Sequence, residues 1–220
     1  MTPGALEGAL QRPFSEPADD RVLDAAREAF EDIGIQRTTM RDIARRAGLG
    51  RATVYRRFPD RDAVVRAVLL REVRGFMAWL DERIDHIEDP AEQTVECFVA
   101  VVTGLRAHSL LNRLLTLEPA AALPALTVDA GAVLAAARSY LAEKLRRHQQ
   151  AGRLRRFDPE PVAEVFVRLA HSMLLTPHGC IPAEDDARSR AFARAHLVPV
   201  IAGWSSSVIR NSGIPSRGGV

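Results

Sequence analysis

Lysine is almost absent from this sequence of 220 residues, because arginine supplies all but one of its 30 basic side chains and the exception is Lys144. The 28 acidic residues leave a formal net charge of only +2, so the total charge does not by itself indicate a nucleic-acid partner. A bias toward arginine is also what a GC-rich genome produces. The distribution of charge along the chain is therefore more informative than its sum.

Cysteine is scarce as well, and the only two, Cys97 and Cys180, lie far apart in the sequence. Nothing in this spacing indicates a disulfide, and reduced thiols in a cytoplasmic protein are the simpler interpretation. No apolar run approaches the roughly 18 residues that a membrane-spanning helix needs. The N-terminus also lacks the basic and apolar regions of an export signal. We therefore expect a cytoplasmic protein that has no membrane partner.

Aromatic residues make up only 5% of the chain, whereas alanine, leucine, arginine and glutamate dominate, and this composition favours helix over strand. Apolar residues recur at intervals of three and four along nearly the whole chain, which is the period of an amphipathic helix. We find neither an alternating strand pattern with hairpin turns nor an internal repeat. The sequence thus predicts an all-α protein of about nine helices.

The two ends lack this periodicity. Residues 1–18 contain three prolines and two glycines, and we expect them to form a flexible arm. Residues 205–220 are rich in serine and glycine and predict a flexible tail. Between them we expect a small helical domain over residues 19–74, and a larger helical domain over residues 75–204 that the long fourth helix joins to it.

Prolines indicate where helices of the larger domain begin or break. Asp89 followed by Pro90 is typical of a helix start. Pro119 and Pro124 are expected to break the chain, and Pro199 to kink or divide the last helix.

The segment from Thr39 to Phe58 carries the most information. Thr39 followed three residues later by Asp42 is a capping-box pattern, which predicts where a helix begins. Gly48 can end that helix by adopting the left-handed conformation that other residues resist. A further helix restarts within two residues. Two short helices joined by so tight a turn must cross steeply, as they do in a helix-turn-helix.

The charge of this segment fits a DNA-binding role. From Ile33 to Pro59 there are seven arginines and one aspartate, which gives a local net charge of +6, and such a block suits the phosphate backbone. Arg51, Ala52 and Thr53 form the first turn of the second helix, the turn that reaches base edges in the major groove. Arginine can bind guanine through two hydrogen bonds, and the methyl groups of alanine and threonine can contact thymine.

These features together resemble the N-terminal domain of the TetR family of bacterial repressors. The resemblance rests on patterns at family spacing, which are Ala25-x-x-x-x-Phe30 with Gly34, Thr39-x-x-Asp42-Ile43-Ala44-x-x-Ala47-Gly48, Thr53-x-Tyr55-x-x-Phe58 and Arg61-x-x-x-Val65. Two positions depart from the family pattern. Gly50 stands where serine is frequent, and glycine caps a helix comparably or slightly less well. Arg57 stands where histidine is frequent, so its contact with DNA need not be the same.

The resemblance implies roles for individual residues. Thr39 and Tyr55 would contact phosphate, and Arg61, where the family usually has lysine, would reach a phosphate from the start of the fourth helix. Phe58 is expected to belong to the core. Arg45 and Arg46 fit either the DNA interface or a solvated helix face. The full set of expected DNA-binding residues is Thr39, Arg51, Ala52, Thr53, Tyr55, Arg56, Arg57 and Arg61.

The resemblance further implies that the larger domain dimerises, usually through its last two helices. The apolar faces of these helices could close a four-helix interface between two subunits, or they could pack only on their own subunit. The candidate dimer residues are Val162, Val165, Leu169, Met173, Phe192, Val200, Ile201 and Trp204.

A small-molecule site in the larger domain is also implied. Its candidate residues are Phe76, Phe98, Leu105, His108, Leu111, Leu115, Tyr140, Phe166 and His171. Glu118 and Arg168, with His108, are the candidate polar groups. Apolar residues at helical spacing equally describe an ordinary core. If they do line a pocket, their apolar bias indicates an apolar or amphipathic effector.

Catalytic chemistry has no support in the sequence. We find no G-x-S-x-G, no H-E-x-x-H and no glycine-rich phosphate loop, and therefore expect neither an enzyme nor a cofactor. The spacing of His171, His178 and Cys180 does not match a common zinc pattern, so no metal is expected.

The expected function is a homodimeric regulator, most simply a repressor that a small molecule releases from a palindromic operator in double-stranded DNA. An activator or corepressor-type regulator of the same fold is the alternative. A helical ligand-binding protein without DNA binding is a third and less favoured possibility.

Overall fold

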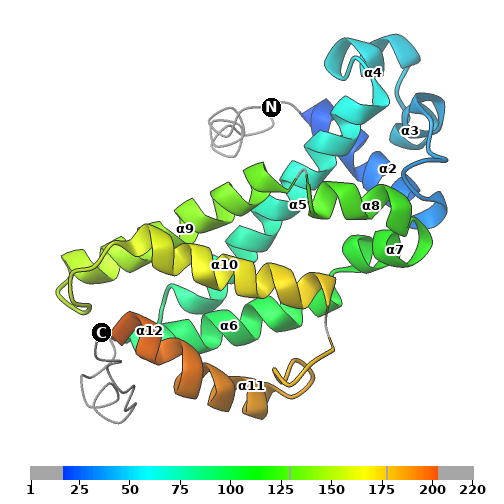
Figure 1. The fold of residues 1–220 in the computed structure, drawn as a ribbon. Helices are drawn as coiled ribbons and strands as arrows, with labels where there is room; N and C mark the ends of the chain where they lie inside the picture. Colours follow the sequence, from blue (N-terminus) through cyan, green and yellow to red (C-terminus); the bar gives the residue numbers. More distant parts are fainter. Residues whose placement is uncertain (1–16, 129, 177, 203–220) are drawn as a thin grey trace, which may run out of the picture.

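The computed structural model describes residues 17–128, 130–176 and 178–202. Every regular element in these ranges is helical, which confirms the predicted all-α class (Figure 1). Most of the expected N-terminal arm, the expected C-terminal tail and the candidate dimer residue Trp204 lie outside the described residues.

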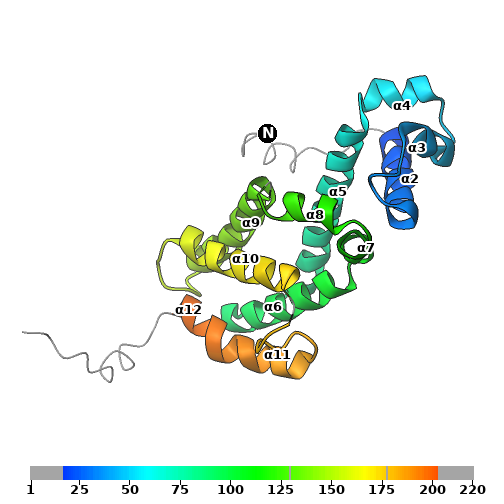
Figure 2. The same cartoon turned by 45° about the vertical axis from the view of Figure 1, so that its right-hand side comes forward.

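Three helices, two of them short, and the start of a long one gather at one end of the molecule (Figure 1). The long helix then runs away from this group toward the larger set of helices, as Figure 2 shows from a second side. These first elements are α2 (Pro17–Ile33), α3 (Met40–Ala47), α4 (Arg51–Arg57) and α5 (Arg61–Ile84).

The larger set contains the remaining helices. In it α9 and α10 pack along one another, and α6 lies in the middle, against α5, α10 and the C-terminal helices. The elements are α6 (Pro90–Ala107), α7 (Ser109–Leu117), α8 (Pro119–Leu126), α9 (Gly131–Gln150), α10 (Pro159–Leu175), α11 (Asp186–Phe192), a π-helical turn (Ala193–Leu197) and α12 (Val198–Ala202).

Local sequence signals account for the helix boundaries at the N-terminal end. The hydroxyl of Thr39 accepts from the Asp42 backbone N–H, and the Asp42 carboxylate accepts from the Thr39 backbone N–H, so the predicted capping box is confirmed. Gly34 and Gly48 end α2 and α3 with φ angles of 87° and 62°. These lie in the left-handed region, which glycine adopts without a steric penalty.

Prolines behave in two ways. Asp89 caps α6 with Pro90 in its first turn, as expected. The expected break at Pro119 is present, because α7 ends at Leu117 and α8 begins at Pro119, whereas the expected break at Pro124 is wrong, because Pro124 lies inside α8. Proline suits the first turn, where its missing N–H is not needed by the helix. The last helix is divided as expected, because a π-helical turn ends just before α12, which contains Pro199.

The core falls into three clusters. The first joins α2, α3 and α4 to Val64 and Val68 of α5, and it also contains Leu110 and Leu114 of α7. The second packs Val95, Phe98 and Val102 of α6 against the C-terminal helices. A third lies between α5 and α6, with Tyr140 against it. The helix α7 therefore shares its core with the N-terminal helices.

Within the described ranges no single helix has both the length and the apolar character to cross a membrane, although the bent pair α6 and α7, which meet at 52°, does by length and composition alone.

Candidate nucleic-acid interface

The turn between α3 and α4 is held by both local and distant contacts. After Gly48, the backbone N–H of Leu49 donates to the Ala44 carbonyl at 3.0 Å. The guanidinium of Arg21, on α2, donates to the carbonyl of Ala47 at 2.7 Å. The end of α3 is thus fixed to α2.

The short helix α4 has distinct inner and outer faces. Val54 and Phe58 point into the first core cluster and are buried, so Phe58 belongs to the core as predicted. Tyr55 is 50% exposed, so about half of this residue remains accessible to solvent. Four residues of the predicted DNA-binding set are exposed on the outer face, namely Arg51, Ala52, Tyr55 and Arg56. Thr53, from the same set, is half-buried.

The cap of α3 is strongly hydrogen-bonded. The hydroxyl of Thr39 donates to the Asp42 carboxylate at 2.5 Å. This bond, together with the backbone hydrogen bond from Thr39, holds the pKa of Asp42 below its usual value. The guanidinium of Arg45 lies 3.1 Å from the same carboxylate. The hydroxyl of Thr39 must therefore turn away from Asp42 if it is to donate to a phosphate.

The arginines of the basic block divide into two groups. Arg45, Arg46 and Arg57 each pair with an acidic residue, which is Asp42, Asp32 or Asp19 respectively. In the part of the chain that the structure describes, the other four have no acidic partner within 4 Å. These four are Arg37, Arg41, Arg51 and Arg56. The uncompensated positive charge is thus concentrated on the α2–α3 turn, the start of α3 and the outer face of α4.

Two of these four arginines were not among the residues that sequence reasoning singled out. Arg37 and Arg41 are exposed and flank the Thr39 cap. Their only signal in the sequence is the local charge. Arg61 was singled out, but here its guanidinium donates to the Gln36 carbonyl at 3.1 Å. It lies 3.6 Å from Asp62, and so it is anchored to the α2–α3 turn.

The candidate pocket residues are dispersed. Phe76 and His108 line the same open groove of about 630 Å³ with Trp79. Phe98 and Phe166 instead pack in the second core cluster. Leu115 packs against the first cluster, and Leu105 and Leu111 are half-buried.

The polar members of the candidate pocket are engaged elsewhere. The hydroxyl of Tyr140 donates to Asp81 at 2.5 Å. Burial raises the pKa of Tyr140, and this hydrogen bond raises it further. A ring nitrogen of His171 lies 2.6 Å from the Leu126 carbonyl. Arg168 pairs with Glu164 on its own helix at 2.6 Å. Glu118 contacts the α2–α3 turn rather than a pocket.

The candidate dimer residues also differ in their surroundings. Leu169, Met173 and Phe192 pack on the second core cluster of their own chain, and Val162 and Val200 are half-buried. Val165 is 55% exposed on α10.

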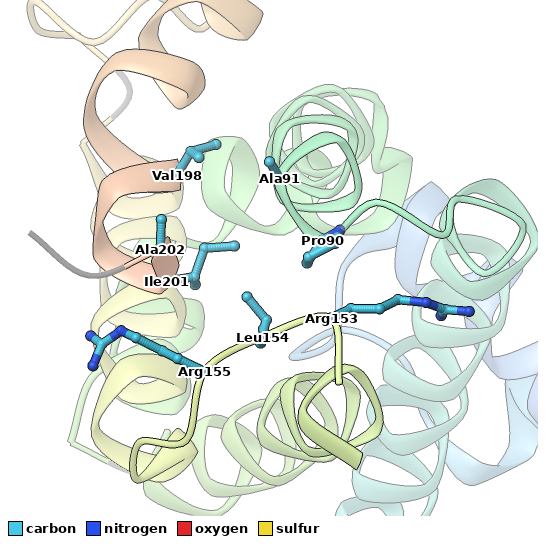
Figure 3. A pocket seen from close by; sticks show the side chains of 8 residues that line it. All are labelled: Pro90, Ala91, Arg153, Leu154, Arg155, Val198, Ile201 and Ala202. Atoms are coloured by element: carbon cyan, nitrogen blue, oxygen red, sulfur yellow. The ribbon is translucent and has the colours of Figure 1, made fainter. Parts of the chain in front are cut away.

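Ile201, another candidate dimer residue, faces inward. It helps to line a cavity of about 260 Å³ where α12 meets the start of α6 and the loop after α9. In Figure 3, Leu154 and Ile201 point toward this cavity, whereas Arg153 and Arg155 extend away from it. No group of three or more His, Cys, Asp or Glu side chains among the described residues is placed to hold a metal ion.

Comparison with known proteins gives consistent results. Residues 22–68 match the sequence model of a family described as "Bacterial regulatory proteins, tetR family". An uncharacterised HTH-type transcriptional regulator from Mycobacterium bovis is 30% identical over 154 residues, which are 70% of this chain and 78% of that protein.

Solved structures share the fold. The TetR family repressor AlkX from Dietzia, implicated in biodegradation of n-alkanes, superposes with a TM-score of 0.63 at 21% identity, over 86% of this chain and 96% of its own. A complex of SmeT with triclosan gives a TM-score of 0.55 at 22% identity, over 93% of this chain and all of the other. SmeT is the repressor of a multidrug efflux pump of Stenotrophomonas maltophilia.

Proposed function

Because this chain belongs to the TetR family and is a DNA-binding transcriptional regulator, we propose that it acts as a homodimeric repressor that a small molecule releases from a palindromic operator. Operator DNA lies in the bacterial cytoplasm, and we propose that the protein acts there.

The outer face of α4 carries this proposal. Arg51, Ala52 and Arg56 are exposed on a helix of seven residues. Arg37 and Arg41 are exposed on either side of the α3 cap, without an acidic partner among the residues that the structure describes. This arrangement suits a helix that enters the major groove while the neighbouring arginines contact phosphates. We assign direct base contacts to Arg51, Ala52 and Thr53, and phosphate contacts to Thr39 and Tyr55.

Dimerisation is expected because the recognition helix α4 is short. A helix of seven residues reaches too few base pairs for selectivity, whereas a twofold dimer reads two half-sites about one helical turn apart. We propose that α10 and the C-terminal helices form the interface, since Val165 leaves an apolar side chain exposed on α10. Repression then follows if the operator overlaps a promoter.

The effector is proposed to bind in the groove that contains Phe76, Trp79 and His108. The rings of Phe76 and Trp79 lie 5.5 Å apart and provide an apolar surface, and Arg27 and Glu72 provide polar groups at its edge. The groove is lined by residues of α2 and α5 and by His108 at the α6–α7 junction, so a molecule bound there would contact both the N-terminal helices and the larger set. The SmeT–triclosan complex supports a small-molecule effector.

The experiment starts by selecting duplexes from random sequence with the full-length protein. We expect a palindrome bound by one dimer, with affinity that falls steeply as salt rises. Arg51→Ala should weaken binding at least tenfold and relax the preference at one base pair of each half-site. Arg147→Ala, an exposed arginine on α9, is the matched control and should bind as the wild type does. Selection of no duplex at low salt would contradict the assignment of the α4 face.

Repression itself needs a measurement in cells. A reporter placed behind the selected palindrome should be expressed more strongly when the gene for this protein is deleted. Lower expression after deletion would instead identify an activator.

A further inference from the structure

The α2–α3 turn is bound by a carboxylate that lies 83 positions away in the sequence. Glu118, between α7 and α8, accepts from the backbone N–H of Ile35 at 2.7 Å and from that of Gln36 at 3.2 Å. Two successive backbone N–H groups that converge in this way form a small anion-binding concavity. Hydrogen bonds to an ionised acceptor are also stronger than neutral ones. Glu118 thus places a negative charge where the turn best accommodates one.

The turn is built to admit this carboxylate. Gly34 has a φ of 87°, and a Cβ at this position would lie 2.6 Å from the Cδ of Glu118. The hydroxyl of Thr38 donates to the Gly34 carbonyl at 2.6 Å and closes the turn on itself. From the other side, Arg61 at the start of α5 donates to the carbonyl of Gln36. The turn that leads into α3 is therefore held by α5 on one side and by Glu118 on the other.

The helix before Glu118 is anchored to α2 as well. The guanidinium of Arg113 donates to the Glu31 carbonyl at 2.8 Å, and the hydroxyl of Ser109 donates to the Glu31 carboxylate at 2.7 Å. Leu110 and Leu114 are buried in the same core as Phe30. Figure 2 shows α7 beside α2 and continuous with α8. Packing attaches α7 along its length, while Glu118 fixes the turn at its far end.

We propose that Glu118 is a positioning residue that sets the orientation of the α3–α4 pair relative to the rest of the subunit. The proposal rests on the dimeric, palindrome-reading function proposed above. In a dimer, the orientation of each α3–α4 pair determines the distance between the two α4 helices. Glu118 lies between α7 and α8, outside the proposed DNA-binding face, and its effect would reach the recognition helix through the Ile35–Gln36 turn.

This role predicts a specific effect on binding. Specific binding needs both α4 helices at the half-site spacing, whereas non-specific binding needs only the positive charge. Glu118→Gln keeps the size of the side chain but replaces one acceptor oxygen with an amide donor that faces a backbone N–H. We expect at least tenfold weaker affinity for the selected palindrome and unchanged affinity for a duplex of unrelated sequence. We also expect faster hydrogen exchange in the peptide that contains Ile35 and Gln36.

Spacing variants sharpen the test. Inserting one base pair between the half-sites should weaken wild-type binding strongly, and the Glu118→Gln protein should lose less affinity. Glu118→Asp, which keeps the charge but is one methylene shorter, should behave like Glu118→Gln and gives the same measurements if the glutamine variant does not fold. Glu82→Gln, on the exposed surface of α5, is the control and should match the wild type throughout.

The outcomes separate this inference from the proposed function. If the wild type selects no palindrome, the proposed function fails. If it does select one, and Glu118→Gln binds that palindrome as tightly as the wild type, Glu118 is not a positioning residue. Equal loss of specific and non-specific affinity in a folded Glu118→Gln protein would also overturn the proposal, because the change would then not act through the spacing of the two α4 helices.

Discussion

The guanidinium of Arg57 lies 2.6 Å from the carboxylate of Asp19, and this pair joins the last turn of α4 to the first turn of α2. Their side chains are only 17% and 20% exposed. Limited exposure reduces screening by water, so such a pair contributes more to stability than a surface pair does. The residue that stands where the family often has histidine therefore fastens the recognition helix to α2.

We predict that Arg57→Ala lowers the free energy of unfolding by about 1–2 kcal/mol, because it leaves the Asp19 carboxylate partly covered and without this partner. Arg51→Ala should change that free energy by less than about 0.5 kcal/mol, as is usual for an exposed side chain. Urea denaturation of both variants and the wild type measures the difference. An Arg57→Ala protein as stable as the wild type would contradict the structural role of this pair.

Asp19→Asn is the complementary variant. It removes the partner but keeps the positive charge of Arg57 next to the DNA-binding face. It should lower stability in the same direction as Arg57→Ala, while affinity for a duplex of unrelated sequence should not fall. A loss of non-specific affinity in Asp19→Asn would mean that the orientation of Arg57, and not only its charge, matters for binding.

The sequence predicted the N-terminal helices well because their signals are local. The Thr39–Asp42 capping box and the Gly48 helix end depend on contacts within a few residues, and both are present. Phe58 is buried as predicted. The charge count likewise located the basic surface. What it could not show is which arginines are paired, since the partners of Arg46 and Arg57 lie on α2, 14 and 38 positions away.

The larger domain was less predictable for a physical reason. An apolar residue at helical spacing packs into a core or lines a pocket with the same pattern, so Phe98 and Phe76 could not be distinguished, although one is core and the other borders a groove. The sequence alone suggests Glu118 only as a candidate polar group of a pocket. Its partners in the structure are backbone groups. Backbone N–H groups occur at every non-proline residue, so no sequence pattern identifies them as partners.

Two helical glycines should respond in opposite ways to alanine. A Cβ at Gly75 meets no atom within 4 Å, so Gly75→Ala should raise the free energy of unfolding by up to about 1 kcal/mol through helix propensity alone. A Cβ at Gly104 would lie 2.7 Å from Phe76 and 2.9 Å from Trp79, and overpacking costs about 1–3 kcal/mol. Gly104→Ala should therefore lower stability. Thermal unfolding followed by circular dichroism measures both, and equal shifts in melting temperature would contradict the close approach at Gly104.

The contact between α6 and α11 predicts a pH dependence. Arg190 binds the Glu96 carboxylate with hydrogen bonds of 2.7 and 3.1 Å. These hydrogen bonds are the main reason that the pKa of Glu96 is lowered. A carboxyl group whose pKa is lowered by folding stabilises the native state above its unfolded pKa, and that stabilisation is lost as pH falls through the folded pKa. The melting temperature should thus decline below about pH 4.5.

Glu96→Gln isolates this contribution. The variant should melt at a lower temperature than the wild type at pH 6, and the two should converge as pH approaches 3. Glu82→Gln is again the exposed control and should run parallel to the wild type. A constant difference between Glu96→Gln and the wild type at every pH would show that packing, and not the charge of Glu96, is responsible.

The two thiols should differ sharply in reactivity. Burial raises the pKa of Cys97 to about 11, and this effect exceeds the opposing influence of the nearby Lys144 ammonium, whereas Cys180 is exposed. Because the thiolate is the reactive form, only about one Cys97 side chain in a thousand is reactive at pH 8. An aromatic disulfide reagent should therefore release one equivalent rapidly from the native protein and two in urea.

Cys180→Ser should abolish the rapid phase and leave the slow one. Cys97 lies against the core between α5 and α6, near Lys144, whose ammonium is held by Asp81 at 2.5 Å and by Asp85. The slow phase therefore reports how rarely the Cys97 thiolate forms and is reached by the reagent. If the native Cys180→Ser protein reacted as fast as an exposed thiol, the raised pKa of Cys97 would be contradicted.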